Sequence, residues 1–272
     1  MIEGVRSVSV ALDVLEAVAF AESEIGVSEV AARLRMAKGA IHRHLRTLTD
    51  RGYLVQNPAT ARYQIGVKFQ LLGRVGAQEN GFFAASEAVM TQLRDTVGES
   101  VVLSAVENHG VRVLATLAGT APVEIGVRAG SLLPFDRSAQ GRVMMAFASG
   151  KRREAFKRTL PPTGRAALEL DLVRAQRQGW LASPGEFVRG INSIAAPIFD
   201  ASDNCVGTIA TVGVFEIPPR GRAKSMIAQL QAAANRISVN LGRRAGFERG
   251  DSVSSPRRAR GAARPDNQVA SS

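Results

Sequence analysis

The segment from Ile25 to Gly66 constrains the fold most, because its apolar residues change from helical spacing to strand-like runs. Ser28 is a favourable N-cap, so we expect a short helix over residues 29–35. The residues expected on its buried stripe are Val30, Ala31 and Leu34. A turn at residues 36–37 then leads into a second helical pattern.

The second helix is predicted over residues 38–50, with a left-handed stop at Gly52. Its apolar face has i, i+4, i+7 spacing and consists of Ile41, Leu45 and Leu48. Its opposite face carries the cations and hydrogen-bond donors Lys38, His42, Arg43 and Arg46. Such a helix suits the DNA major groove, where phosphates and base edges present mainly acceptors.

Two β-prone runs follow, at residues 53–55 and 62–65, joined by a turn-rich link at 57–61. They predict a two-stranded wing in which Arg62 is placed to contact phosphate. A generic helical unit with a solvated charged face is the alternative interpretation. The order of capped helix, turn, basic-faced helix, glycine stop and hairpin favours a winged helix-turn-helix.

Composition indicates a globular chain of two domains. The 272 residues are 45% apolar, and no apolar run reaches the roughly 18 residues needed to span a membrane. Acidic residues interrupt the N-terminal apolar run, which argues against a signal peptide. The one cysteine, Cys205, excludes an internal disulfide and a cysteine-based metal site. We therefore expect a cytoplasmic location, no membrane contact, and neither metal nor cofactor.

The net charge of +11 is spread along the chain. Residues 1–74 hold ten Lys and Arg against seven acids, so the predicted DNA-binding unit is only mildly basic. The positions of the cations therefore carry the DNA-binding prediction, and bulk charge adds only nonspecific attraction.

We expect four parts: a winged helix-turn-helix at 1–66, a linker helix at 67–80, an α+β domain at 81–246, and a basic tail at 247–272. The tail lacks apolar periodicity, which predicts disorder. Before the helix-turn-helix, a helix over residues 9–21 should pack behind it. The residues expected on its inner face are Leu12, Leu15, Val18 and Ala19.

The third part begins with a helix over residues 82–97 and then mixes strands with helices. Strands are expected at 100–106, 111–117, 123–128, 193–199 and 205–215, and further helices at 138–149, 152–159, 171–178 and 223–241. We expect one hairpin at each end of the sheet. This interspersion favours an α+β sensor domain over a Rossmann fold.

An enzyme is disfavoured by the residues that are missing. No metal-ligand spacing, P-loop, Gly-x-Ser-x-Gly or dinucleotide-binding motif is present. Two of the three histidines, His42 and His44, lie on the predicted recognition helix, and Cys205 has no base near it in sequence. We expect no catalytic residues.

The chain resembles the IclR family of bacterial transcription regulators from about Val5 to Leu241. The resemblance rests on Ser7–Ala17, the helix-turn-helix, residues 50–54, residues 133–142 (LPFDRSAQGR), residues 179–190, and residues 194–200 (IAAPIFD). It implies an N-terminal winged helix, a GAF-like C-terminal domain, dimers that often pair into tetramers, and control by a small organic effector.

The predicted recognition helix departs from the family pattern at its start. Relatives usually open it with Pro-Lys-Ser-Thr, whereas this chain has Ala37-Lys38-Gly39-Ala40. Two hydroxyl groups are lost, and Gly39 would permit a close backbone approach to DNA. Sequence preference should therefore differ from that of relatives.

The predicted effector site departs further. The resemblance places Ser193 where oxo-acid-binding relatives have Cys, Ala210 and Val212 where they have Ser, and Ser183 where they have Asp. Burial of an apolar ligand body contributes about 25 cal/mol per Å². We therefore expect an aromatic or medium-sized organic acid, with its body against Ile125, Val127, Ala210 and Val212. Its carboxylate would lie at the start of the helix at Ser138 and Ala139, near free backbone amides.

A purely structural role stays open for that site, because Ala210 and Val212 would also suit an ordinary hydrophobic core. Three functions remain: an effector-controlled DNA-binding regulator, a regulator whose C-terminal domain serves only oligomerisation, and a catalytic or protein-binding module in which the winged helix contacts protein. The first is preferred, as a dimer or tetramer on a pseudo-palindromic operator.

Overall fold

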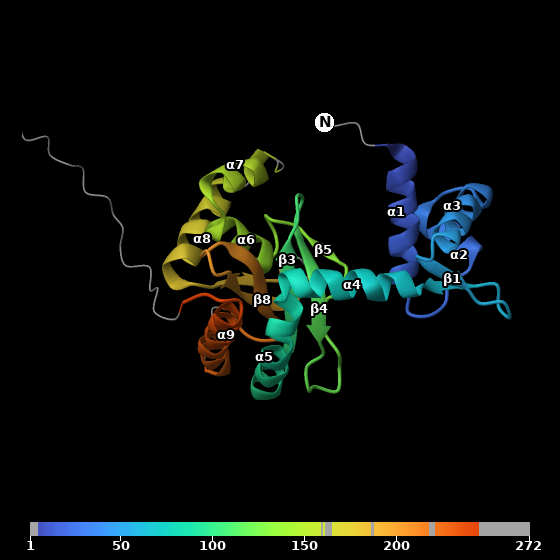
Figure 1. The fold of residues 1–272 in the computed structure, drawn as a ribbon. Coiled ribbons are helices and arrows are strands. Elements are labelled where there is room, and N and C mark those ends of the chain that lie inside the picture. Colours follow the sequence, from blue (N-terminus) through green and yellow to red (C-terminus); the bar gives the residue numbers. More distant parts are fainter. Residues whose placement is uncertain (1–4, 159, 161–164, 186–187, 218–220, 245–272) are drawn as a thin grey trace, which may run out of the picture.

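The computed structural model describes residues 5–158, 160, 165–185, 188–217 and 221–244 (Figure 1). A small unit of helices with a hairpin and a larger unit built on a sheet are joined by one helix, α4 (Val67–Asn80). The basic tail predicted over 247–272 lies outside the described residues.

The small unit is a winged helix-turn-helix. Its elements are α1 (Arg6–Ala19), α2 (Val27–Leu34), α3 (Lys38–Asp50), β1 (Leu54–Gln56) and β2 (Tyr63–Ile65). Ile41 and Leu45 of α3 are fully buried against α1 and α2, as their spacing predicts. Each such side chain contributes about 1.5–3 kcal/mol by leaving water. The strands pair antiparallel with Leu54 opposite Ile65, and Gly52 takes the predicted left-handed conformation after α3.

Two predictions about the first helices are wrong in part. On α1, Val18 is buried and Leu15 packs against the core as predicted, but Leu12 and Ala19 are exposed, and Val14 and Ala17 are buried instead. Helix α2 begins at Val27 with Gly26 as N-cap, so Ser28 lies inside its first turn. The Glu29 carboxylate replaces the expected cap, because it accepts the backbone N–H of Gly26 at 2.8 Å.

The larger unit starts with α5 (Phe82–Val97), which ends at the left-handed Gly98. Six antiparallel strands form one sheet in the order β5-β4-β3-β8-β7-β6. Their bounds are β3 (Ser100–Val106), β4 (Val111–Leu117), β5 (Leu132–Leu133), β6 (Leu181–Pro184), β7 (Asn192–Phe199) and β8 (Cys205–Gly213). The β3–β4 and β7–β8 hairpins meet at the centre through β3 and β8, not at the two ends as predicted.

Helices cover both faces of this sheet (Figure 1). On one face α5 and α9 (Arg222–Asn240) enclose a core that includes Leu93, Ile209 and Leu230. On the other face lie α6 (Ala139–Phe147), α7 (Gly150–Arg158) and α8 (Arg165–Gln178), whose core includes Ala210. The architecture is the predicted α+β, GAF-like fold, with layers of helix, sheet and helix.

Two strand assignments differ from the prediction. Residues 123–128 run without regular structure, although their composition is β-prone, and the strand beside β4 is the two-residue β5. Strand β6 was not predicted, and it closes the other edge of the sheet against β7. None of the helices in the described part of the chain is long and apolar enough to cross a membrane.

Candidate functional site

The outward side of α3 is the first candidate surface. Lys38, Gly39, His42, Arg43 and Arg46 are all exposed, because the opposite side of the helix is held in the core. Arg46 lies 3.9 Å from Asp50 across one helical turn, with both side chains in solvent, so this ion pair is weak. The structure thus brings the predicted cations onto one continuous face.

Arg62 lies on the wing, but its guanidinium is bonded within the protein. Its Nε donates to the carbonyl of Glu24 at 2.8 Å, and its Nη2 is 2.6 Å from the Glu29 carboxylate. The Glu24 carboxylate in turn accepts from Asn57 at 2.8 Å and from Thr60 at 2.9 Å. These bonds fasten the wing to the start of α2. Sequence reasoning missed Glu24, because nothing local indicates that it pairs with residues more than thirty positions away.

Glu24 gives the wing a dependence on pH. Hydrogen bonds from Asn57 and then Thr60 hold the pKa of its carboxyl below the ordinary value of 4.5. Because the folded-state pKa is lowered, this stabilisation is complete above about pH 4.5 and is lost as pH falls through the lowered value. We expect the amide NMR signals of Asn57 and Thr60 to be constant at neutral pH and to shift in acid.

Replacement of that carboxylate should remove the acid shift at Asn57 and Thr60. In Glu24→Gln these two amide signals would change little across the same acid range, whereas Glu29, whose pKa is lowered by the Gly26 amide and then by Arg62, would keep its own acid response at Arg62. Glu87→Gln, at an exposed position of α5, is the matched control and should keep the transition. An identical acid transition in Glu24→Gln would contradict the assignment.

The second candidate site lies on the α6 side of the sheet. Ser183, Ser193 and Val212 are direct cross-strand neighbours on β6, β7 and β8. Ala210 occupies the next position along β8 on the same face and is fully buried. Directly paired residues on one face have Cβ atoms about 4.5–5.5 Å apart. The structure therefore brings together, in one row across three strands, the four residues that the family resemblance selected.

Ser183 is the unusual member of this row. Its side chain is only 4% exposed, and among the described residues its hydroxyl has no hydrogen-bond partner. A buried polar group without a partner costs about 1–3 kcal/mol. The hydroxyl is therefore a ready donor or acceptor for a polar group placed beside β6.

An apolar cluster adjoins the row. Ile125 and Val127 are half-buried and pack against a cluster of buried residues that includes Val212. Sequence reasoning missed the other members, which are Val102, Val113, Leu133 and Ile191. The alternation Val111-Arg112-Val113 in β4 is a signal that its valines face inward, but β3 is apolar at consecutive positions and gives no such signal.

Ser138 caps α6 and is not a free ligand group. Its hydroxyl donates to the carbonyl of Pro134 at 2.7 Å and accepts the Gly141 amide at 3.0 Å. Ala139 is fully buried in the cluster that contains Ala210. What α6 offers to an anion is therefore its backbone amides and its helix dipole.

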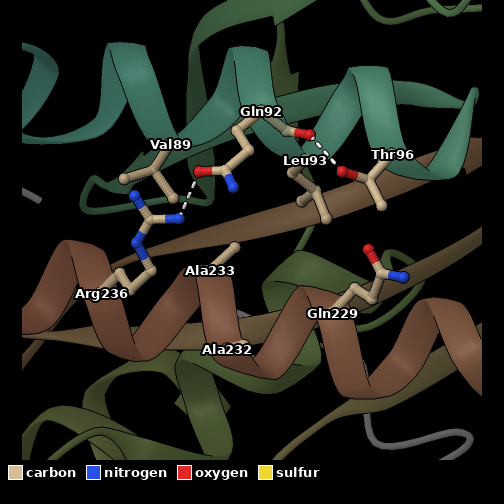
Figure 2. A pocket seen from close by; sticks show the side chains of 8 residues that line it. All are labelled: Val89, Gln92, Leu93, Thr96, Gln229, Ala232, Ala233 and Arg236. Atoms are coloured by element: carbon tan, nitrogen blue, oxygen red, sulfur yellow. Dashed lines mark hydrogen bonds between the residues drawn. The ribbon is translucent and has the colours of Figure 1, made fainter.

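A groove with several polar side chains lies on the other face of the sheet from the candidate effector site (Figure 2). It lies between α5 and α9 and has a volume of about 150 Å³. Figure 2 shows Arg236 of α9 hydrogen-bonded to Gln92 of α5 across it. Its polar groups thus join the two helices. No group of His, Cys, Asp and Glu that could hold a metal occurs in the part of the chain that the structure describes.

Comparison with known proteins identifies the family of both domains. The family model for the IclR helix-turn-helix domain matches residues 7–58, and the model "Bacterial transcriptional regulator IclR C-terminal" matches residues 77–239. The glycerol operon regulatory protein of Streptomyces griseus is 29% identical over 254 residues, which cover 89% of this chain and 98% of that protein.

Solved structures give the same result. Pseudomonas aeruginosa HmgR is similar with a TM-score of 0.70 and 26% identity, over 88% of this chain and all of that chain. An IclR homologue from Microbacterium hydrocarbonoxydans, crystallised with 4-hydroxybenzoate, has a TM-score of 0.72 and 21% identity, over 86% of this chain and 98% of that one. The chain belongs to the IclR family and is a transcriptional regulator with a helix-turn-helix domain and a C-terminal effector domain.

Proposed function

We propose that this regulator binds a pseudo-palindromic operator as a dimer and is controlled by a small organic acid with an aromatic or apolar body. The exposed cationic face of α3 carries the proposal, because the same helix buries its apolar side. Lys38, His42, Arg43 and Arg46 would enter the major groove. Ser28 and Gly39 would approach the phosphate backbone.

The structure changes the role that we propose for Arg62, which the sequence predicted only as a phosphate contact. Its bonds to Glu24 and Glu29 orient the wing. The side chain remains 40% exposed, so it can still approach a phosphate while it supports the wing. We therefore propose that Arg62 acts on DNA mainly by fixing the wing's direction.

Dimerisation is supported by apolar side chains that the single chain leaves in solvent. At the start of α1 these are the N-cap residue Val5 with Val8 and Leu12, and on α4 they are Val67, Leu71 and Val75, all more than half exposed. Their spacing of three or four residues makes a stripe on each helix. Stripes of this kind mark protein–protein contacts, and a second copy would cover them. Two recognition helices held in this way would read two half-sites.

The effector proposal rests on the orphan hydroxyl of Ser183 beside the apolar group of Ile125, Val127 and Val212. The hydroxyl and the amides of α6 suit a carboxylate, and the apolar group suits a ring or short chain. The related structure with 4-hydroxybenzoate provides a probe of this class.

The effector site can be tested with 4-hydroxybenzoate and Val212→Asp. A carboxylate at this position, 5% exposed, would repel the acid and disrupt its apolar contacts. We expect at least a tenfold loss of affinity by calorimetry, since two like charges about 4 Å apart repel by about 4 kcal/mol at an effective dielectric constant of about 20, against roughly 1.4 kcal/mol for a tenfold change.

The matched control is Val239→Asp on α9, where the side chain is 41% exposed and lies away from the site. It should leave the affinity unchanged. Equal affinity in Val212→Asp would place the acid elsewhere. No binding by the wild type would reject this acid and favour the alternative, a C-terminal domain that serves only oligomerisation.

Regulation would follow from two arrangements of the winged helices. An effector that prefers one arrangement shifts operator affinity by its differential binding to the two. Selection of bound duplexes from a random pool, at fixed near-physiological salt, tests the DNA half of the proposal. Enrichment of an inverted repeat supports it. Unenriched duplexes, with binding that collapses as salt rises, would overturn it.

A further inference from the structure

The loop from Ile125 to Gly130, which we call the strap, lies between the proposed effector site and the winged helix-turn-helix. Its inner side chains, Ile125 and Val127, are half-buried in the apolar cluster that contains Val212. Glu124, Gly126 and Arg128 alternate with them and are exposed. The inner face of the strap therefore contacts the region where the effector body is proposed to bind.

A few isolated hydrogen bonds attach the strap to β4, and the strap does not form a strand of the sheet. Thr116 donates its hydroxyl to the carbonyl of Val127. Arg112 donates to the carbonyl of Gly130 at 2.7 Å, and the Gly130 amide donates to Val113 at 2.8 Å. A segment held this way can move as a unit at lower cost than a strand within a sheet.

The outer face of the strap lies against the winged helix. The Arg128 guanidinium is 3.2 Å from the carboxylate of Glu22, in the turn between α1 and α2, but both side chains are more than four-fifths exposed, so this ion pair is weak. Gly130 adopts φ +83°, and a Cβ added there would lie 2.5–2.8 Å from three atoms of the Phe20 ring. The ring of Phe20, at the end of α1, thus rests on the backbone of the strap.

This contact is connected to the wing. Glu22 is two residues from Glu24, whose carboxylate holds Asn57 and Thr60. Arg33 of α2 also donates to the carbonyl of Ala17 at 2.9 Å, which ties α2 to the end of α1. A shift of the α1–α2 turn would therefore reach the wing and α2, and α3 through the core that it shares with α1 and α2.

We propose that the strap is an intramolecular docking element that transmits effector binding to the winged helix. Ligand contact with Ile125 and Val127 changes the position of the strap, and Gly130 and Arg128 transfer the change to Phe20 and Glu22. Its regulatory use rests on the proposed function, whereas the docking itself does not. Coupling of this kind changes the affinity at each site by the same factor.

Hydrogen exchange of the full chain tests the docking without DNA or effector. The variants are Val127→Ala on the inner face, Phe20→Ala on the winged helix, and the two combined. Val123→Ala is the matched control, because it makes the same change in the same loop at a residue that is 72% exposed. The reporters are the hydrogen-bonded amides of Phe20, Ala21 and Ile25.

We expect Val127→Ala to raise exchange at these amides about threefold or more, as local opening becomes easier. In the Phe20→Ala background the same change should add nothing, and Val123→Ala should be silent. Arg128→Gln should weaken the contact in the same direction. An effect of Val127→Ala that stays within the strap and β4, or one that persists equally without Phe20, would overturn the inference.

Operator affinity then separates this inference from the proposed function. On a selected duplex, Val127→Ala should change Kd about fivefold or more, and only while Phe20 is present. If the wild type selects no operator, the proposed function fails and the exchange data still decide the docking. If an operator is bound and Val127→Ala acts identically with and without Phe20, the strap does not carry the signal.

Discussion

Substitution of both Lys38 and Arg43 by alanine is expected to abolish operator recognition without unfolding the chain. Both side chains lie on the exposed face of α3, away from the buried Ile41 and Leu45. Two good base contacts contribute about 1–3 kcal/mol each to discrimination, so specific affinity should fall at least about 30-fold. Each lost phosphate contact should also lower the salt slope by about one.

The control is Lys151→Ala with Arg158→Ala, two exposed cations of α7. This pair makes the same change in net charge outside the winged helix, and it should leave the selected duplex bound. Fluorescence anisotropy over a range of salt concentrations measures both variants. Equal weakening by the two pairs would show that bulk charge, and not the position of the cations on α3, attracts DNA.

The largest loss of stability is expected for Gly141→Ala at the start of α6. A Cβ at this position would lie 2.7 Å from the Cα of Phe135, 2.8 Å from the Ser138 hydroxyl, and closer still to the carbonyl of Pro134. Two of these neighbours are backbone and cannot rotate away. Overpacking of about 1–3 kcal/mol and a lost cap of about 1 kcal/mol predict a loss of about 2–4 kcal/mol.

Differential scanning calorimetry should therefore show a transition of the effector domain lowered by roughly 4–16 °C, at about 2–4 °C per kcal/mol. Gly150→Ala is the control, since nothing lies within 4 Å of an added Cβ at the start of α7. It should change stability by no more than about 1 kcal/mol. A Gly141→Ala protein as stable as the wild type would mean that α6 does not approach residues 134–135 this closely.

The bounds of α3, α5, β3 and β4 could be predicted to the residue because their signals are local. In α3 a one-sided apolar pattern is followed by Gly52, which can adopt the left-handed conformation that stops a helix. The prediction of the inner face of α1 was wrong at Leu12 and Ala19 for a physical reason. Apolar residues surround that helix, and Val8 and Leu12 are more than half exposed in the single chain. Periodicity alone does not show which stripe meets the core.

For the proposed effector site too, the sequence selected residues and the structure showed their contacts. Resemblance to the family selected Ser183, Ser193, Ala210 and Val212 one by one, and antiparallel pairing then placed them side by side. That the Ser183 hydroxyl has no partner, whereas the Ser138 hydroxyl is used in a cap, depends on distances to other elements. Those distances exist only in the folded chain.

The sequence by itself determined the class of each domain, the recognition helix and its cationic face, since these follow from spacing within one segment. The tertiary structure decided what joins distant segments: Glu24 and Glu29 on Arg62, β3 beside β8, and Phe20 on Gly130. It also left residues 123–128 without strand structure, although β5 pairs only with Val111 and Arg112 of the neighbouring β4. Partners far apart in the chain meet only when the whole fold brings them together.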